Sequence, residues 1–185
     1  MSDNPNVRRV GLDVLFYDEI TPHTAVEFAV HLDAAADESI ARALRENRER
    51  PPVNVRINSH GGGCYSSLAM IDAIRGYQAR GLQINGCVEG YAASAATAVL
   101  QACDTRRMGR TAVMLIHQVR VWGLGGKTTD IADEAKTMQA LERIYKGLYL
   151  RRWKAGPKKL DAILGREHLL LADECLKLGL VDEVV

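Results

Sequence analysis

Hydrophobic residues alternate with polar ones in some segments of the chain and recur every three or four positions in others. Residues 11–17, directly after Val10, place Leu12, Val14 and Phe16 on alternate positions and predict a first strand. Strands that alternate with helices favour an α/β fold of stacked β-α-β units. The patterns predict further strands at 53–57, 82–88, near 107, 112–116 and 181–185, and helices starting at 21 and after 63 and spanning 94–102, 128–153, 158–164 and 173–178.

The longest helical pattern runs from Thr128 to Trp153, where apolar residues recur at three- and four-residue steps. Met138, Leu141, Tyr145 and Leu148 share one stripe of this helix. A small head domain offers too little surface to cover such a stripe. We therefore expect the helix to project as a handle and to pack between subunits.

The chain has 185 residues, with 24 Lys and Arg against 23 Asp and Glu, and 47% of its residues are hydrophobic. This length suits a single domain spanning residues 1–185. A net charge of +1 gives no electrostatic footprint for nucleic acid, and no run approaches the roughly 20 apolar residues of a membrane span. We expect a cytoplasmic protein with no nucleic-acid or membrane partner.

The cysteines Cys64, Cys87, Cys103 and Cys175 are far apart in the sequence and form no C-x-x-C pair. We expect buried free thiols and a reducing compartment. The histidines show no H-E-x-x-H or other metal-ligand spacing. The sequence therefore predicts neither a metal site nor a cofactor.

A glycine run, Gly61-Gly62-Gly63, stands between a predicted strand and a predicted helix. Backbone N–H groups without Cβ crowding can face an anion there. The run has no G-K-[ST] continuation and no G-x-G-x-x-G spacing, which argues against a nucleotide site. A close-packing turn and an oxyanion-binding turn both stay open.

Ser94 and His117 are the side chains with the best-placed chemistry. Ser94 enters an alanine-rich helix, where a serine is either a helix cap or a nucleophile beside free N–H groups. His117 follows the apolar run 113–116, so it is either a strand-end residue or a rigidly held general base.

Five segments in order give these residues a context: Ile-Asn-Ser-His-Gly-Gly at 57–62, Gly-Tyr-Ala-Ala-Ser-Ala at 90–95, Met-Leu-Ile-His-Gln at 114–118, Gly-Lys-Thr-Thr-Asp-Ile at 126–131 and Gly-Leu-Val-Asp at 179–182. Through them nearly the whole chain resembles the proteolytic subunit of the Clp protease, a serine peptidase of the crotonase-like superfamily. The resemblance implies a crotonase-like α/β fold with a projecting handle helix.

The resemblance also implies a catalytic triad. Ser94 takes the place of the nucleophile and His117 that of the general base. Counting back from the segment 179–182, the acidic member falls on Glu167, where the family usually has aspartate. Asp161 and Asp173 are the alternatives for this role, and a surface carboxylate is the alternative interpretation of Glu167.

The resemblance assigns the oxyanion hole to the backbone N–H groups of Gly62 and Ala95. The family commonly has methionine where Ala95 stands and proline where His60 and Val119 stand. Backbone donors tolerate these side-chain changes. The shape of the adjoining substrate pocket is the property that they alter.

The expected function is endopeptidase hydrolysis of unfolded polypeptides inside a homo-oligomeric chamber. The resemblance implies rings of seven subunits, stacked as a tetradecamer, with Arg166 at a position that links ring contacts to the active site and Gly165 replacing its acidic partner. The family engages a hexameric ATP-driven unfoldase through a longer N-terminal segment. Because only the nine residues MSDNPNVRR precede Val10 and the first predicted strand, we expect an open pore and weak dependence on that unfoldase.

Two other functions use the same fold. An acyl-coenzyme A hydratase or isomerase also uses two backbone N–H groups as an oxyanion hole, although such enzymes usually rely on carboxylates at the reacting centre. A catalytically inactive, ring-forming subunit is the other alternative, of cellular or phage origin.

Overall fold

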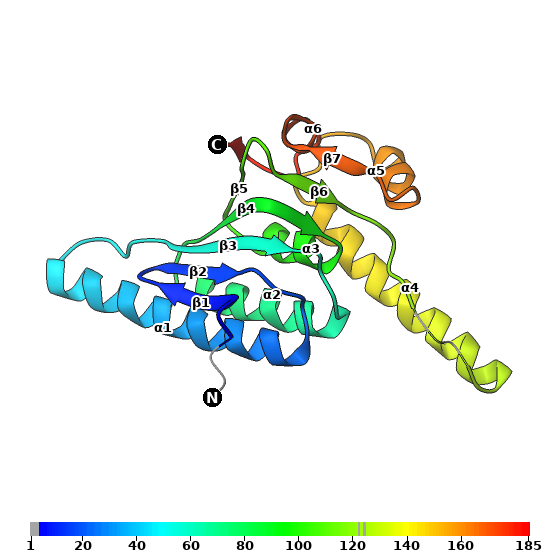
Figure 1. The fold of residues 1–185 in the computed structure, drawn as a ribbon, viewed down its shortest axis with the longest axis horizontal. Coiled ribbons are helices and arrows are strands. Elements are labelled where there is room, and N and C mark those ends of the chain that lie inside the picture. Colours follow the sequence, from blue (N-terminus) through cyan, green and yellow to red (C-terminus); the bar gives the residue numbers. More distant parts are fainter. Residues whose placement is uncertain (1–3, 122, 124) are drawn as a thin grey trace.

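The computed structural model describes residues 4–121, 123 and 125–185, which build an eight-stranded, mostly parallel sheet with helices around it (Figure 1). The strand order is β1-β2-β3-β4-β5-β8, with β6 beside β4 and β7 beside β6. The strands are β1 (Val7–Val10), β2 (Asp13–Phe16), β3 (Val53–Ser59), β4 (Ile84–Ala93), β5 (Thr105–Met108), β6 (Val113–Leu115), β7 (Leu169–Leu171) and β8 (Glu183–Val184). The helices are α1 (Pro22–Glu46), α2 (Cys64–Gln78), α3 (Ala95–Ala102), α4 (Thr128–Leu150), α5 (Pro157–Leu164) and α6 (Ala172–Leu178).

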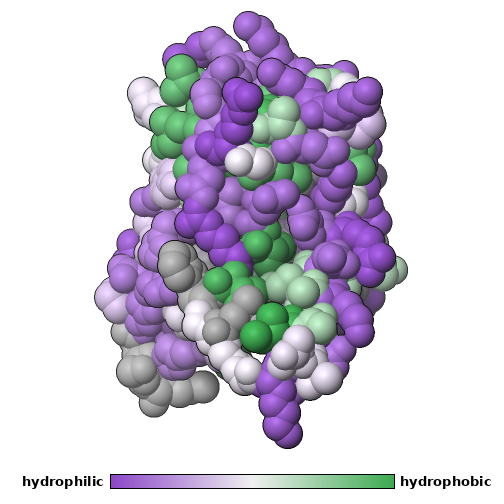
Figure 2. Space-filling model, turned by 90° about the vertical axis from the view of Figure 1, so that its right-hand side faces the viewer, coloured by the Kyte–Doolittle hydropathy of each residue, from purple (hydrophilic) through white to green (hydrophobic). Residues whose placement is uncertain are grey.

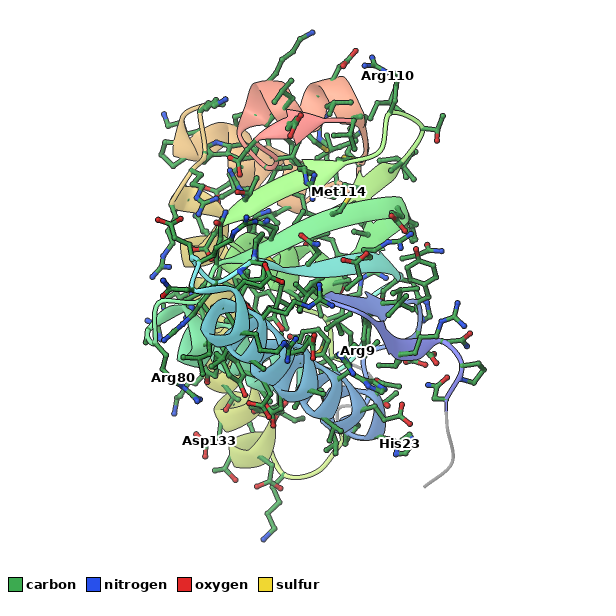
Figure 3. The ribbon with its side chains drawn as sticks, turned by 90° about the vertical axis from the view of Figure 1, so that its left-hand side faces the viewer. Arg9, His23, Arg80, Arg110, Met114 and Asp133 are labelled. Atoms are coloured by element: carbon green, nitrogen blue, oxygen red, sulfur yellow. The ribbon has the colours of Figure 1, made fainter. Side chains whose placement is uncertain are left out.

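The helices α1, α2 and α3 lie on one face of the sheet. They connect β2, β3, β4 and β5, which are parallel neighbours in sequence order, and right-handed crossovers place such connections on the same side. On β3 the alternate residues Val53, Val55 and Ile57 are buried beneath these helices. Figure 3 shows α1 to one side of the strands, with Met114 on β6.

The opposite face of the sheet carries a polar network. Arg56 on β3 donates hydrogen bonds of 2.8 and 3.0 Å to Glu89 on β4, and it lies 3.7 Å from Asp13. Tyr17 also donates to Glu89. Burial acts to raise the pKa of Glu89, but the bonds from Arg56 and Tyr17 outweigh it and hold that pKa below its usual range. Charged pairs thus take the place of a second helix layer.

The strand β4 pairs with different neighbours along its length. Residues 85–88 pair with β5, whereas residues 91–93 pair with β6. Between these halves the register with β3 shifts, and Gly90 adopts a φ of 80° that favours glycine. The sequence predicts a loop after residue 88, but β4 continues to Ala93, because Gly90 lets it bend toward β6 instead of ending.

The N-terminal prediction is wrong in one respect. Val7–Val10 already forms a strand, β1, which pairs antiparallel with β2 through a turn at Gly11. Arg8 and Arg9 interrupt the hydrophobic alternation because β1 is an edge strand with one neighbour. β7 is likewise absent from the sequence prediction.

The helix α4 matches the predicted long helix but ends at Leu150. Leu141, Tyr145 and Leu148 are buried within the chain, so the prediction that this stripe cannot be covered by its own domain is wrong. The N-terminal half does project from the sheet (Figure 1) and leaves Ile131 43% exposed. Figure 3 shows Asp133 on this projecting half.

The cysteine prediction is confirmed in part. All four cysteines are free thiols, and Cys103 and Cys175 are buried. Burial raises the pKa of each of these two thiols to about 12, so they stay protonated at neutral pH. Cys64 and Cys87 are partly exposed.

An ion pair fixes the C-terminal segment to the core. Arg106 on β5 is 1% exposed, and its guanidinium donates to Asp182 at 2.5 and 3.1 Å, to Gln101 at 2.5 Å and to the carbonyl of Gly179 at 2.8 Å. Burial acts to raise the pKa of Asp182, but these bonds outweigh it and the pKa lies below its usual range. The segment 179–182 is therefore a structural element of the fold.

Asp182→Asn is expected to lower the free energy of unfolding at pH 7 by about 3 kcal/mol, because buried Arg106 loses its counter-ion. A carboxyl with a lowered folded pKa stabilises the protein above its unfolded pKa of about 4, and this contribution is lost as the pH falls through the folded pKa. The difference between variant and wild type should therefore shrink from pH 7 to pH 3 in urea titrations.

Asp133→Asn is the matched control, since Asp133 pairs with Lys136 on an exposed helix face and should change stability by less than about 0.5 kcal/mol. Equal losses in both variants, or a loss in Asp182→Asn that is constant with pH, would contradict the role given to the Arg106–Asp182 pair.

Candidate active site

A glycine turn after β3 lies directly against the corner between β4 and α3. A Cβ on Gly61 would be 2.6 Å from the carbonyl oxygen of Ala93 and 2.8 Å from the Cβ of Ser94. A Cβ on Gly62 would be 2.3 Å from the carbonyl oxygen of Ile20. Both glycines also have positive φ, at 94° and 143°. The turn therefore needs glycine for close approach of two backbones.

Ser94 stands at the corner itself, with φ 54° and ψ −128°. This ψ lies outside the left-handed helical region, so the conformation is strained for a residue with a side chain. Ser94 occupies the N-cap position of α3, but its side chain makes no capping hydrogen bond. The interpretation of this hydroxyl as a helix cap is therefore wrong.

His117 reaches the same place from β6. Ala93 of β4 pairs with Leu115 of β6, and the backbone N–H of Ser94 donates to the carbonyl of Leu115 at 2.8 Å. His117 follows two residues later and is partly buried. Both side chains line one cavity of about 550 Å³, whose wall comprises Glu19, His60, Gly62, Gly63, Cys64, Ser94, Ala95, His117, Gln118, Val119, Arg120, Tyr145 and Tyr149.

Two backbone donors at this cavity are free. Among the hydrogen bonds formed within residues 4–121, 123 and 125–185, none uses the N–H of Gly62 or of Ala95 as donor. Ala95 is the first residue of α3, where the N–H has no partner inside the helix. Gly62 lies between Gly61 and Gly63, which both bond to Ile20. The structure thus places the two predicted oxyanion donors on the wall that holds Ser94.

The ring of His117 contacts the backbone of the next residue. Its Nδ1 atom is hydrogen-bonded to the carbonyl oxygen of Gln118, whose N–H donates to Leu164 at 3.1 Å. A carbonyl only accepts, so Nδ1 is the donor in this contact, and in a neutral imidazole this leaves Nε2 as the acceptor. This tautomer is the one that a general base requires at Nε2.

Glu167 lies apart from this pair. It adopts a φ of 51° and forms an ion pair with Arg120, both side chains being nearly half exposed. In the part of the chain that the structure describes, no hydrogen bond joins His117 to Glu167 or Ser94 to His117. Of the alternative acids, Asp161 pairs with Lys146 at 2.5 Å and Asp173 lies in the first turn of α6.

Two tyrosines of α4 also belong to the cavity wall. Tyr145 and Tyr149, four residues apart on α4, are 7% and 2% exposed, and their hydroxyls bond to Ser67 at 2.5 Å and to Thr97 at 2.6 Å. Burial raises the pKa of Tyr149 to about 12. The four-residue spacing of these tyrosines predicts that both face the core, and nothing in the sequence around them indicates a functional site.

Over the described residues, no group of three or more His, Cys, Asp or Glu side chains is placed to hold a metal ion. None of the helices in the described ranges is long and apolar enough to cross a bilayer.

On the face seen in Figure 2, hydrophobic residues gather around a hollow between hydrophilic ones.

Comparison with known proteins bears on the same residues. The family model described as Clp protease matches residues 19–185. The ATP-dependent Clp protease proteolytic subunit of Deinococcus radiodurans is 30% identical over 154 residues, which cover 81% of this chain and 74% of that protein. The matched region includes the glycine turn, the Ser94 corner and the end of β6.

Replacing Ser94 by glycine should stabilise the protein. Glycine adopts φ 54° and ψ −128° without a Cβ clash, so Ser94→Gly is expected to raise the free energy of unfolding by about 1 kcal/mol. Ser94→Ala keeps the Cβ and should change it by less than about 0.5 kcal/mol. Thermal and urea unfolding of the two variants and the wild type measure this difference. Equal stability of the two variants would show that the corner is not strained.

Proposed function

This chain belongs to the Clp protease family, and on that premise we propose that it is a serine endopeptidase that cuts unfolded polypeptides through an acyl-enzyme on Ser94. The observation that supports this proposal is the shared cavity: Ser94, His117 and the free N–H groups of Gly62 and Ala95 all line it. A nucleophile, a base and two oxyanion donors are the minimum set for acyl transfer.

The proposed reaction has two halves. The Nε2 atom of His117 takes the proton of the Ser94 hydroxyl as its oxygen attacks the peptide carbonyl, and the N–H groups of Gly62 and Ala95 stabilise the resulting oxyanion. His117 then passes the proton to the leaving amine, and the acyl-enzyme forms. Water, deprotonated by the same Nε2 atom, attacks this ester, and His117 then returns that proton to the Ser94 oxygen as the carboxylic acid leaves.

For the acidic member we propose Glu167. Its carboxylate would leave Arg120 and accept a hydrogen bond from the Nδ1–H group of His117, in the place that the carbonyl of Gln118 fills in this conformation. Its extra methylene relative to aspartate lengthens its reach from the loop before β7. Asp161 is also held in an ion pair, with Lys146, so the preference for Glu167 rests on its distance in sequence from the segment 179–182.

The triad can be tested by substitution. Ser94→Ala and His117→Ala should each lower kcat for a fluorogenic peptide by about 10⁴–10⁶-fold, because the members of a triad act as a unit. Glu167→Gln should lower kcat by about 10²-fold or more, since a neutral amide cannot stabilise the imidazolium. His23→Ala, on an exposed face of α1, is the control and should match the wild type.

The acid assignment would be wrong if Glu167→Gln kept the wild-type kcat while Asp161→Asn or Asp173→Asn abolished activity. Activity that survived Ser94→Ala would rule out the acyl-enzyme on this residue.

A second candidate function has one observation in its favour. Because Glu167 pairs with Arg120, a ring-forming subunit with a misaligned triad fits the same geometry. A fluorophosphonate probe that labels the wild type but not Ser94→Ala would argue against this candidate. The cavity wall includes one carboxylate, Glu19, but the pair of Ser94 and His117 beside the backbone donors favours the peptidase over the acyl-coenzyme A hydratase alternative.

We also propose a homo-oligomer, with rings of seven subunits stacked as a tetradecamer around a chamber. Val26 and Val30 on α1 are 63% and 47% exposed, and Ile131 lies on the projecting half of α4, so the isolated chain leaves apolar side chains for neighbours. Folded substrates, whose unfolding requires about 5–15 kcal/mol, would need an ATP-driven unfoldase to enter, whereas unfolded chains would not.

Light scattering of the active enzyme tests this assembly. The expected mass is about that of fourteen chains of 20.3 kDa. Ile131→Asp should reduce it to that of a single ring, because a charge would enter the contact between stacked α4 helices. Lys136→Glu, on an exposed position of the same helix, serves as the control for charge alone. A fully active monomer would contradict the proposal.

A further inference from the structure

The carbonyl oxygen of Ser94 accepts two hydrogen bonds from one residue of α3. Thr97 donates its backbone N–H to this oxygen at 3.0 Å and its hydroxyl to the same oxygen at 2.6 Å. Thr97 is 0% exposed, so water cannot replace either bond. The hydroxyl therefore adds a second, buried restraint to an ordinary helix-start contact.

Tyr149 of α4 completes this arrangement. Its phenol oxygen lies 2.6 Å from the hydroxyl oxygen of Thr97. Because the single hydroxyl proton of Thr97 goes to the carbonyl of Ser94, Tyr149 must be the donor in this bond. Burial raises the pKa of Tyr149 to about 12, so the phenol keeps its proton at neutral pH. The hydrogen bonds run in one direction, from Tyr149 through Thr97 to Ser94.

The carbonyl of Ser94 and the N–H of Ala95 belong to the same peptide group. A peptide group is planar and trans, so its N–H points opposite to its C=O. Fixing the carbonyl toward Thr97 therefore aims the N–H of Ala95 away from Thr97, toward the cavity whose wall includes Ala95. Rotation of this peptide group would move the donor out of line.

We propose that Tyr149, acting through Thr97, is a positioning residue that holds the Ala95 N–H in line with the oxyanion of the transition state. Tyr149 lies on α4, so the docking of this helix onto α3 sets the geometry of the oxyanion hole. The proposal deepens the peptidase function proposed above and rests on it. It adds two residues, 52 positions apart in sequence, to the groups on which catalysis depends.

Three substitutions test the proposal in the full chain. Loss of a whole oxyanion donor costs about 10²–10³ in kcat. A donor that is present but loosely held should cost less, so Thr97→Val is expected to lower kcat by about 10–100-fold and Tyr149→Phe by about 3–10-fold. Thr97→Ser restores the hydroxyl and should return kcat to within about 3-fold of wild type. KM should stay within about 2-fold throughout, because the oxyanion exists only in the transition state.

Affinity for a peptide boronate should report the same geometry. Its tetrahedral adduct on Ser94 places an oxygen in the oxyanion hole, so its inhibition constant should rise in parallel with the fall in kcat. A merely structural role for Tyr149 would lower the melting temperature and leave the boronate affinity of the folded enzyme unchanged.

Tyr77→Phe is the matched control. Tyr77 is also a buried tyrosine with a hydrogen-bonded hydroxyl, donating to Asp33 at 2.7 Å, but it lies outside the cavity wall. This variant should keep wild-type kcat and boronate affinity. The double variant of Thr97→Val and Tyr149→Phe should lose no more kcat than Thr97→Val alone, because both changes break one chain of bonds.

Wild-type kcat and boronate affinity in Tyr149→Phe would overturn the proposal, as would full additivity of the two changes. If Thr97→Val does not fold, Tyr149→Phe decides, since it removes a single oxygen atom. Failure of the peptidase function is distinguishable: there the wild type itself would cleave no peptide and bind no boronate through Ser94.

Discussion

The register between the parallel strands β4 and β6 decides whether this molecule has a site. Ala93 pairs with Leu115, and the N–H of Ser94 bonds to the carbonyl of Leu115, so Ser94 and His117 leave the sheet at one edge. A slip of one residue would turn each side chain of β6 to the other face. The bend at Gly90 makes this register possible, because it frees the end of β4 from β5.

Strain at the Ser94 corner is local and is held by well-packed neighbours. Every residue of α3 is buried, and the glycine turn touches the corner without a Cβ on either Gly61 or Gly62. The backbone of Ser94 is also bonded on both sides, to Leu115 through its N–H and to Thr97 through its carbonyl. Strained conformations persist where the surroundings over-determine them, and this corner meets that condition.

Most elements of the crotonase-like α/β fold were predictable because their hydrophobic periods are long and regular. The exceptions have physical reasons. β1 carries Arg8 and Arg9 since an edge strand needs only part of the hydrophobic pattern, and the end of β4 consists of small residues that resemble a loop. The stripe of α4 was recognised, but sequence spacing does not tell whether a second subunit or the chain's own helices cover it. Here the chain itself covers the stripe at Leu141, Tyr145 and Leu148.

Some residues of the candidate site were also predictable from the sequence, and others were not. Ser94 and His117 were predictable because each stands at the end of a predicted helix or strand. Glu167 was predicted only from the resemblance to a family motif. The partner of Glu167 was not predictable, because Arg120 is 47 residues away and belongs to no motif. Thr97 was equally hidden, since a threonine inside an alanine-rich helix has no pattern that distinguishes packing from positioning.

The proposed oxyanion hole consists of backbone donors, so its geometry would depend on residues outside the motifs. The N–H groups of Gly62 and Ala95 do not depend on the side chain at position 95, so alanine there leaves the donor intact. A backbone N–H stabilises an oxyanion only while its peptide group keeps one orientation. The carbonyl of the same peptide group must therefore be held in place by its own hydrogen-bond donors. In this chain those groups are the N–H and hydroxyl of Thr97, with Tyr149 behind them. Comparison of motif residues alone would therefore miss the part of the site that fixes its geometry.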